Sequence, residues 1–346
     1  MFGLLLEGGG MRAGFVAGAL MALSDKALTN FDVAIAISAS VPSLAYFVTG
    51  QREEMEIVWR EELNTSKLVR YRNIPVASLA LSIKRPVINL DYLVYDVFEK
   101  KYPLNLRKLM SARIKCFFAA TRLSQGDYVF LGVEPEHIYE TMRACMAIPV
   151  CYPGAVCIDD EEYIDGGTVN SLPADDLMME GMEKVLAILT KPLGWEGSPP
   201  NLFKRALFWR YFKRYNWMPD KLKKAAEDYT NQVIHLEEWA REMPSRAFII
   251  APDEMPPANL VSRSHRKINQ TVDMGYRAVE ELENEIRRFL QPDDPFKLQI
   301  KPDLNPGSDQ AILSEFDDEL SKNVSTIRKP CVEIKPFIND KYELTH

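Results

Sequence analysis

A serine stands at the point where a predicted strand turns into a predicted helix. The strand is the apolar run Val33–Ile37, the serine is Ser38, and the helix is expected to begin near Pro42. A strand that turns sharply into a helix with a serine at the corner is the layout of a nucleophile elbow. In that layout the hydroxyl projects from the end of a strand and the helix directs its N-terminal amides at the reacting group. The pattern therefore predicts that Ser38 is a nucleophile.

The elbow differs from its usual form at two positions. Glycine normally stands two residues before and two residues after the serine, because strand and helix approach closely and the serine backbone is strained. This sequence has Ala36 and Ser40 at those positions. The added side-chain carbons are either absorbed by the packing or displace Ser38 enough to slow its chemistry. Ser40 and Ser43 also carry hydroxyl groups, but both fall inside the predicted helix rather than at its corner.

Two glycine-rich turns are candidates to complete a site around this serine. The apolar run Phe2–Leu6 has the length of a strand and leads into Glu7–Arg12, which contains three successive glycines. Such glycines leave backbone N–H groups uncovered, and the helix expected to follow adds its positive end. The loop is therefore suited to hold a phosphate or to stabilise an oxyanion. Asp165 ends another short predicted strand, directly before Gly166 and Gly167, and an isolated turn of this kind is most often structural.

The glycine loop also matches a second pattern. Gly8-x-Gly10-x-x-Ala13 satisfies a loosened dinucleotide-binding fingerprint, and Asp32 lies about twenty residues further along the chain. In that fold the acidic residue ends the second strand, whereas Asp32 precedes the run Val33–Ile37. A nucleotide-binding protein is therefore an alternative that the strand assignment disfavours.

Composition limits the classes of function. A chain of 346 residues with 47% hydrophobic content can bury a sizeable core in one or two domains. Its net charge of −7 argues against nucleic acid as the main partner. The five cysteines form no C-x-x-C pair, which is typical of a reducing compartment and predicts no zinc site. None of the four histidines is placed convincingly to complete a Ser-His-Asp triad.

Two apolar stretches in the first 51 residues could be mistaken for targeting signals. Met1–Leu23 has no basic first segment and contains Glu7 and Arg12, so we expect no secretory signal. Val33–Gln51 is uncharged and long enough to span a bilayer. A strand followed by a helix explains its serines and its proline better than a membrane span does.

The remainder of the chain reads as a succession of helices and strands around these turns. Helical patterns cover residues 52–62, 91–101, a segment from about Glu136, 221–242 and 267–290. Strand patterns cover residues 114–121, 128–133 and 185–189, the first two joined by a turn at Gln125-Gly126-Asp127.

Together, the glycine loop, the strand-end serine and the Asp-Gly-Gly turn resemble the patatin-like phospholipase family. Further similarities are Phe31-Asp32 before the serine, the segment Ala144–Pro149 with Tyr152-Pro153 before the aspartate, and the later stretch from Phe248 to Tyr276, which is similar to the bacterial branch. The resemblance covers about residues 1–290. The sequence departs from it at Ala13, where glycine is common, and at Cys145, where serine is frequent, as well as at the two elbow positions.

The resemblance implies a three-layer α/β/α fold with a mostly parallel central sheet and a C-terminal helical extension. It also implies a lipid acyl hydrolase of the phospholipase A, lysophospholipase or esterase type. Ser38 would attack an ester carbonyl and form an acyl-enzyme, and Asp165 would accept its proton, a dyad in place of a triad. The oxyanion would be received by the loop of Gly8, Gly9, Gly10, Met11 and Arg12. The alternative within the family is a protein silenced by its altered elbow that keeps a lipid-binding surface.

The resemblance implies neither cofactor nor metal. Its implied partners are a phospholipid or another lipid ester and a membrane surface, with no nucleic acid, in a cytoplasmic protein that binds membranes peripherally. Residues 1–290 would form the hydrolase domain, and residues 291–346 would be an appended segment with no assigned role. Nothing in the sequence indicates an oligomeric state.

A basic and aromatic segment lies within residues 203–242. Phe203–Lys224 holds eight basic residues and one acidic residue, interleaved with aromatic side chains, a composition suited to an anionic lipid interface. We expect either a membrane-docking surface or a lid over the active site with solvated charges. The residues predicted to contact the membrane are Trp209, Arg210, Lys213, Arg214 and Trp217.

Overall fold

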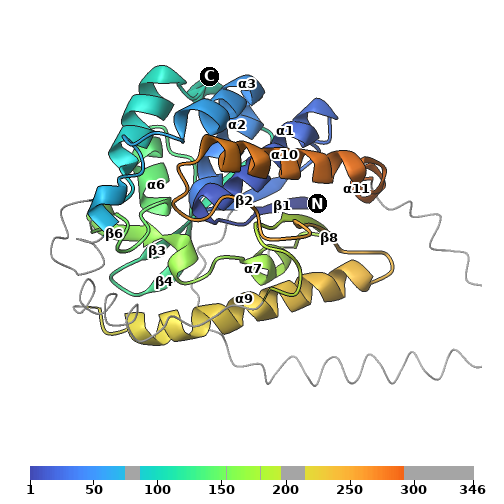
Figure 1. Ribbon diagram of the computed structural model, residues 1–346. Coiled ribbons are helices and arrows are strands. Elements are labelled where there is room, and N and C mark those ends of the chain that lie inside the picture. Colours follow the sequence, from blue (N-terminus) through green and yellow to red (C-terminus); the bar gives the residue numbers. More distant parts are fainter. Residues whose placement is uncertain (75–85, 153, 180, 196–214, 292–346) are drawn as a thin grey trace, which may run out of the picture. The chain divides into compact units, whose positions relative to one another are not determined.

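One sheet of eight strands runs through the described part of the chain, and helices cover both of its faces (Figure 1). The computed structural model describes residues 1–74, 86–152, 154–179, 181–195 and 215–291. In chain order the strands are β1 (Phe2–Leu6), β2 (Val33–Ile37), β3 (Lys115–Arg122), β4 (Asp127–Leu131), β5 (Val156–Ile158), β6 (Glu161–Asp165), β7 (Lys184–Ile188) and β8 (Ala247–Ile250).

Five neighbouring strands of this sheet are parallel. The order is β5-β6-β3-β2-β1-β7-β8, and β4 also pairs with β3. β1 lies parallel to β2 and β7, β2 to β3, and β7 to β8, whereas β4, β5 and β6 form antiparallel pairs. Parallel neighbours need crossover connections, and helices supply these crossovers. The fold is therefore the mostly parallel, three-layer α/β/α arrangement that the sequence predicted.

The helices divide between the two faces of the sheet. On one face lie α1 (Gly14–Asp25), α2 (Val41–Thr49), α3 (Arg52–Ile57), α6 (Ile138–Cys145) and α10 (His265–Glu281), and on the other lie α7 (Ala174–Met179) and α9 (Met218–Arg241) (Figure 1). The other described helical segments include two π-helices, η3 (Val58–Glu62) and η5 (Tyr92–Lys101), the short α5 (Leu106–Met110) and α11 (Glu283–Phe289), besides four short 3₁₀ segments: η1 (Gly10–Ala13), η2 (Ser38–Ser40), η4 (Tyr71–Asn73) and η6 (Gly166–Thr168).

The apolar core has two parts because side chains of a strand alternate between the faces of the sheet. On β1, Leu4 and Leu6 are fully buried among residues of α1, α2 and α10, including Phe15. Leu5, between them, is fully buried among residues of α7 and α9, including Leu236. The strand that leads into the glycine loop is thus fixed from both sides.

Two glycines allow α1 and α10 to touch through their backbones. A Cβ atom added at Gly18 would lie 1.9 Å from the carbonyl oxygen of Val272, and one added at Gly275 would lie 1.8 Å from that of Phe15. Real Cβ atoms do not approach backbone oxygens so closely. Glycine at both positions is therefore required for this helix contact, which sets α10 against the helix that follows the glycine loop.

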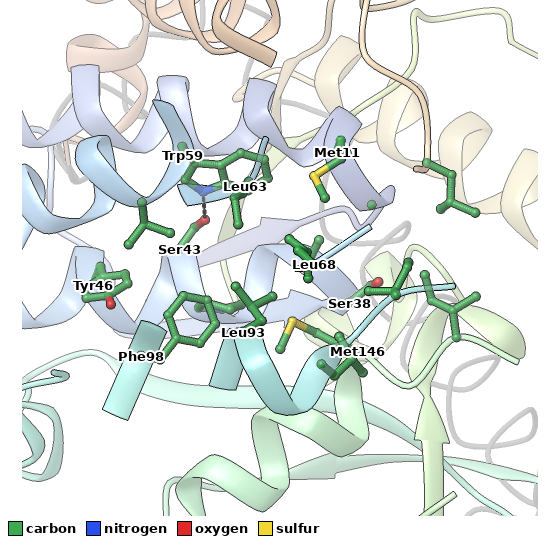
Figure 2. Close-up of a pocket in the computed structure, with 18 residues that line it drawn as sticks. Met11, Ser38, Ser43, Tyr46, Trp59, Leu63, Leu68, Leu93, Phe98 and Met146 are labelled. Carbon is green, nitrogen blue, oxygen red and sulfur yellow. Dashed lines mark hydrogen bonds between the residues drawn. The ribbon is translucent and has the colours of Figure 1, made fainter. Parts of the chain in front are cut away.

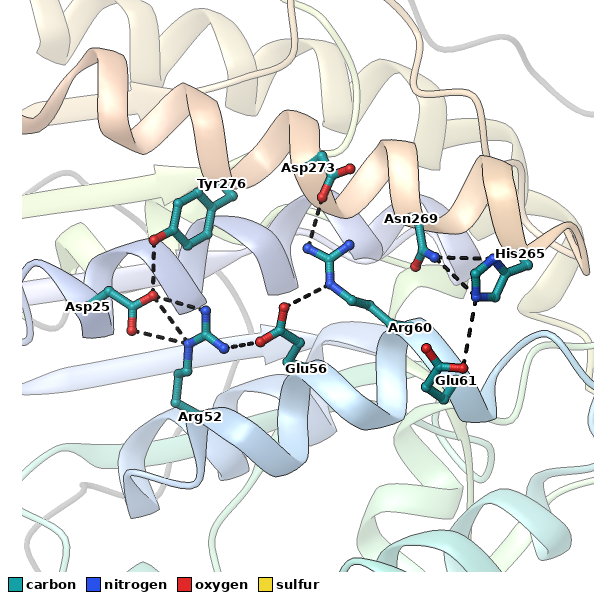
Figure 3. Close-up of polar contacts among 9 residues, drawn as sticks. All are labelled: Asp25, Arg52, Glu56, Arg60, Glu61, His265, Asn269, Asp273 and Tyr276. Atoms are coloured by element: carbon teal, nitrogen blue, oxygen red, sulfur yellow. Dashed lines mark hydrogen bonds and ion pairs between the residues drawn. The ribbon is translucent and has the colours of Figure 1, made fainter.

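A chain of ion pairs also joins α10 to α1 and α3 (Figure 3). Arg52 binds Asp25 at one end (3.0 Å), and Arg60 binds Asp273 at the other (2.8 Å). Glu56 accepts hydrogen bonds from both arginines. All five side chains are partly exposed, and exposed pairs are worth at most about 1 kcal/mol each. The network therefore orients α10 more than it stabilises the fold.

Several predicted elements differ in detail from those observed. Residues 267–290, expected as one helix, form α10 and α11 with a break at Leu282. Residues 58–62 and 92–101 are π-helical, a distinction that an apolar period does not make. The helix expected from Lys221 begins at Met218, where Pro219 occupies the first turn. The segment 291–346, expected as an appended segment, lies outside the described residues except for Gln291.

The uncharged stretch Val33–Gln51 forms β2 and α2, as expected, rather than one continuous helix. Within the described ranges, no helix combines the length and the apolar character that crossing a bilayer requires.

Replacing Gly275 with alanine should force α10 away from α1. We expect the Gly275→Ala change to lower the free energy of unfolding by about 1–3 kcal/mol, the usual cost of overpacking, despite the better helix propensity of alanine. Chemical denaturation measures this change. Gly132→Ala is the control, because an added Cβ at Gly132 meets nothing within 4 Å. Equal stability of the two variants would contradict the close helix contact.

Candidate active site

The register of β3 brings two chain segments together. The last residue of β2, Ile37, lies opposite Ala119 of β3, and the last residue of β6, Asp165, lies opposite Ala120. β2 runs parallel to β3 and β6 runs antiparallel to it, so both strands end at consecutive positions of β3. The residue that follows β2 is Ser38, which therefore emerges beside Asp165.

Ser38 and Asp165 form a direct hydrogen bond. The Ser38 hydroxyl donates to Oδ2 of Asp165 over 2.6 Å, and the two residues are only 5% and 3% exposed. Ser38 has a φ of 55°, a left-handed conformation that costs a non-glycine residue about 1–3 kcal/mol and is typical of a nucleophile elbow. The short turn η2 (Ser38–Ser40) leads into α2, whose N-terminus supplies a positive partial charge near the serine.

The Asp165 carboxylate is buried with few partners. Burial raises its pKa from 3.8 to about 7, although the hydrogen bonds from the Ser38 hydroxyl and the Gly167 amide act in the opposite direction. The Gly167 N–H donates to Oδ1 (2.8 Å), which orients Oδ2 toward the serine. A carboxylate whose pKa lies near neutrality is a far better general base than an exposed aspartate.

The glycine loop packs directly against the serine. A Cβ atom added at Gly8 would lie 2.7 Å from Cβ of Ser38, so only glycine allows this approach. Gly10 has a φ of 58° and lies against Leu260, whose carbonyl oxygen accepts the Met11 amide (3.3 Å). The Arg12 amide donates to the Gly9 carbonyl oxygen, so the amides of Met11 and Arg12, two of the five predicted loop residues, are already bonded.

The two departures from the usual elbow are both accommodated. Ala36 is fully buried and its methyl group packs in the core between β1 and β3. Ser40 is also fully buried, and its hydroxyl donates to the carbonyl oxygen of Glu7 over 2.7 Å. Ser40 therefore links the elbow to the first residue of the glycine loop.

An apolar cavity extends from Ser38 into the protein (Figure 2). Ser38 and Met11 lie at one end, and Tyr46 and Phe98 lie at the other. The side chains between them are Trp59, Leu63, Leu68, Leu93 and Met146. Polar groups of the wall are satisfied within the protein: the Trp59 indole donates to the Ser43 hydroxyl (2.9 Å), and the Tyr46 hydroxyl donates to the Tyr102 carbonyl oxygen (2.6 Å). The cavity thus offers carbon rather than hydrogen-bonding groups.

The other predicted site residues have mixed positions. Nε of Arg12 is buried without a hydrogen-bond partner in the described part of the chain. Trp217, predicted to contact a membrane, is half-buried and donates from its indole to the Leu123 carbonyl oxygen (2.9 Å), so it packs on the β3–β4 turn. The remaining predicted membrane residues, Trp209, Arg210, Lys213 and Arg214, lie outside the described residues.

The described histidines have partners other than Ser38. No described histidine hydrogen-bonds to Ser38: His235 binds Asp175 (2.8 Å), and His137 lies near Asp159. Within the same ranges there is no group of three His, Cys, Asp or Glu residues able to hold a metal ion. Asp32 accepts the Phe2 amide (2.8 Å) at the start of β1 and precedes β2, so it lies away from the glycine loop.

The sequence did not indicate the buried polar contacts that hold the start of the glycine loop. Glu7 is fully buried and forms an ion pair with Lys191, and its Oε2 accepts the Thr190 amide (2.6 Å). The available signal was a charged residue at the end of an otherwise apolar strand. Its partners follow β7, and only the parallel pairing of β1 with β7 brings them near.

Comparisons with known proteins give a family, a relative and a structural neighbour. A family profile described as patatin-like phospholipase matches residues 4–178, more than half of the chain. The uncharacterized protein YjjU of Escherichia coli (strain K12) is 26% identical over 270 residues, which cover 74% of this chain and 66% of that protein. The chain thus spans slightly less than two thirds of the length of that relative. The crystal structure of VipD from Legionella pneumophila aligns with a TM-score of 0.47 and 13% identity, over 82% of this chain and 66% of that chain.

The raised pKa of Asp165 predicts a specific dependence of stability on pH. Between about pH 4 and about pH 7 the folded protein holds a proton on Asp165 that the unfolded chain has released, so this group's contribution to stability falls as the pH rises through that window. The Asp165→Asn variant lacks this titration. The difference in free energy of unfolding, variant minus wild type, should therefore rise by on the order of 4 kcal/mol between the lower and the upper pH, since one pKa unit corresponds to about 1.4 kcal/mol.

Urea denaturation of both proteins at a series of pH values measures this difference. Other carboxylates titrate equally in both proteins and cancel. Parallel stability curves for the two proteins would show that the pKa of Asp165 is not raised.

Proposed function

The chain belongs to the patatin-like phospholipase family, and from this we propose that it is a lipid acyl hydrolase that cleaves ester bonds through Ser38 and Asp165. The observation that carries the proposal is the buried 2.6 Å hydrogen bond between these side chains at the end of an apolar cavity. Nucleophile and base lie within the distance that proton transfer requires.

The reaction would proceed in two steps. In the first, the Ser38 oxygen attacks the ester carbonyl while its proton passes to Asp165, and the departing alcohol then takes that proton. In the second, Asp165 accepts a proton from water, the resulting hydroxide attacks the acyl-enzyme, and Ser38 recovers its proton as the fatty acid leaves. Asp165 must be ionised for each attack, and its pKa of about 7 keeps a substantial ionised fraction near neutral pH.

The glycine loop is proposed to stabilise the oxyanion that forms in each step. Gly8 packs against Ser38, Gly10 lines the cavity together with Ser38, and in the described ranges no backbone acceptor is bonded to the Gly9 or Gly10 amide. We therefore assign the oxyanion hole to these two amides, with the N-terminus of α2 adding its partial charge. The proposed oxyanion hole is therefore smaller than the five-residue loop that the resemblance implies, because the amides of Met11 and Arg12 already have partners.

The substrate class follows from the cavity and the family. Patatin-like phospholipases act on lipids, and the cavity that begins at Ser38 is lined almost wholly by hydrocarbon. An acyl chain placed there would leave the polar remainder of the substrate outside. Membrane contact is part of the proposal, since such substrates reside in bilayers, and the basic segment 203–224 remains the sequence-based candidate for it. A cytoplasmic location and the division at residue 290 likewise remain proposals.

The two rivals are disfavoured by specific observations. A silenced elbow would be expected to separate Ser38 from its base, yet the hydroxyl lies 2.6 Å from the carboxylate and both elbow substitutions are accommodated. A dinucleotide site would need room for a pyrophosphate at the glycine loop. Gly8 packs against Ser38 there, and Asp32 lies before β2 rather than at its end.

Removing either member of the dyad should abolish turnover without unfolding the protein. We expect Ser38→Ala and Asp165→Asn each to lower kcat for a short-chain ester by about 10⁴-fold or more, as in other enzymes whose nucleophile and base act together. Covalent labelling by a fluorophosphonate probe should disappear in Ser38→Ala. Ser111→Ala is the control, because Ser111 is exposed and does not line the cavity. A wild-type protein that neither labels nor hydrolyses any ester would contradict the proposal, as would full activity of Asp165→Asn.

A further inference from the structure

A buried polar cluster lies beneath the glycine loop, outside the proposed dyad. Glu7, the residue before Gly8, is 0% exposed, and its carboxylate binds the Lys191 ammonium, which is 7% exposed. The other carboxylate oxygen accepts the Thr190 amide over 2.6 Å. Full burial of a glutamate side chain is rare in proteins and occurs where the carboxylate is paired, as it is here.

Two side-chain hydroxyls fix the backbone of the loop. The Ser40 hydroxyl donates to the Glu7 carbonyl oxygen (2.7 Å), and the Thr190 hydroxyl donates to the Gly8 carbonyl oxygen (2.7 Å). A peptide unit is planar, so a carbonyl oxygen held in place also fixes the N–H of the next residue, which points the opposite way. Thr190 thus sets the direction of the Gly9 N–H, one of the two amides assigned to the oxyanion hole, and Ser40 fixes the peptide plane directly before it.

The Lys191 ammonium is enclosed by aromatic rings from a distant part of the chain. It lies 3.8 Å from the ring centroid of Tyr229, on α9, and 4.6 Å from that of Trp195. The Tyr229 hydroxyl also hydrogen-bonds to Glu7, and this contact together with burial raises its pKa. Replacing a buried ion pair with apolar residues is often neutral or stabilising, so stability alone does not account for the cluster.

We propose that Glu7, Ser40, Thr190 and Lys191 are positioning residues that hold the glycine-loop amides in the orientation that receives the oxyanion. The inference rests on the proposed function. Glu7 and Lys191 anchor the loop at its start, while the two hydroxyls orient successive peptide planes. Ser40, which replaces a glycine of the usual elbow, thereby takes part in the reaction's geometry without touching the substrate.

Thr190 gives the sharpest test. Thr190→Val removes the hydroxyl with little change of volume, whereas Thr190→Ser keeps it. We expect Thr190→Val to lower kcat for a short-chain ester by about 10- to 100-fold with KM changed less than threefold, because a misdirected oxyanion donor affects the transition state more than the bound ester. Thr190→Ser should keep kcat within about threefold of the wild type. The pH at half-maximal kcat/KM should stay the same in both, since the base is untouched.

Further variants extend the test to the rest of the cluster. Ser40→Ala should lower kcat in the same way, and Glu7→Gln and Lys191→Met should do so where they fold, as judged by thermal unfolding. Wild-type kcat in a folded Thr190→Val and a folded Ser40→Ala would overturn the inference. Failure of the proposed function is distinguishable, because then the wild type itself would show neither esterase activity nor Ser38-dependent probe labelling.

A separate observation concerns the surface near the cavity. Six basic residues on two segments far apart in the sequence form no ion pair with any other described residue: Lys67, Arg70, Arg72, Arg263, Arg266 and Lys267. The segments adjoin, because Arg263 donates to the Val69 carbonyl oxygen (3.3 Å) and its guanidinium stacks on Tyr71 at 4.7 Å. We call these six residues the basic rim.

The basic rim borders the cavity that starts at Ser38. Leu68, between two of the basic residues, lines that cavity, and so does Leu260, three residues before Arg263. No acidic residue occurs in residues 64–74 or 255–272, although the whole chain carries a net charge of −7. The acids on neighbouring segments include Glu61, which lies 3.9 Å from His265, and Glu62, Asp91 and Asp96, which line a surface pocket together with Lys67 and Arg70. Tyr71, 41% exposed, adds an aromatic ring of the kind that sits at headgroup depth.

From this placement we infer that the basic rim docks the protein on an anionic phospholipid surface. Cations that form no ion pair with a described residue and that border an apolar cavity complement the negative charge of such a surface, which attracts them. The cavity would then open toward the layer that holds its substrate. This surface is distinct from the segment 203–224 and consists only of described residues.

Vesicle co-sedimentation tests the basic rim in a Ser38→Ala background, so that the lipids stay intact. Vesicles of phosphatidylcholine with about 30% phosphatidylglycerol provide the negatively charged surface. Arg72→Glu, Arg266→Glu and Lys267→Glu together should weaken binding at least tenfold. The matched control reverses three other exposed, unpaired cations, Arg107, Lys108 and Lys115, and should bind like the parent. Equal binding of the two triple variants, or equal binding to pure phosphatidylcholine, would overturn the inference, as would a parent that binds neither vesicle.

Discussion

The molecule depends on keeping one carboxylate away from water. Asp165 is enclosed at the end of β6, with the Ser38 hydroxyl and the Gly167 amide as its hydrogen-bond donors, and this shielding gives it the basicity that an exposed aspartate lacks. The sheet makes the enclosure possible. Because β2 and β6 end at consecutive positions of β3, the proposed nucleophile and base meet without a flexible loop between them. In the proposed dyad no histidine carries the proton.

The strained backbone of Ser38 is compatible with an elbow that lacks both customary glycines. Ala36 fills core volume, and the Ser40 hydroxyl forms a hydrogen bond to the residue that starts the glycine loop. The position where close approach permits only glycine is on the loop instead, at Gly8, which contacts the serine itself. The elbow is therefore closely packed as usual, but the glycine that allows it is Gly8 of the glycine loop rather than a neighbour of Ser38 in the sequence.

Local patterns in the sequence predicted the strand-end serine and the Asp-Gly-Gly turn, and the resemblance that these patterns carry predicted the fold class. These features are encoded within a few residues, where apolar runs, glycine and proline determine backbone geometry. The 2.6 Å contact between Ser38 and Asp165 joins residues 127 positions apart, and it was anticipated through resemblance rather than spacing. The pairing of Glu7 with Lys191 spans 184 positions and arises only from the parallel register of β1 and β7. Nor did any pattern indicate that the Leu260 carbonyl oxygen would capture the Met11 amide.

That capture has a mechanical consequence. The glycine loop runs directly into α1 at Gly14, and Leu260, on which Gly10 rests, lies five residues before α10 begins at His265. The same two helices are in backbone contact at Gly18 and Gly275. The glycine loop is therefore held between the N-terminal ends of α1 and α10, two helices in backbone contact. Its rigidity comes from this helix pair as much as from the sheet. A small rotation of α10 would therefore move the glycine loop relative to Ser38 while every strand stays in register.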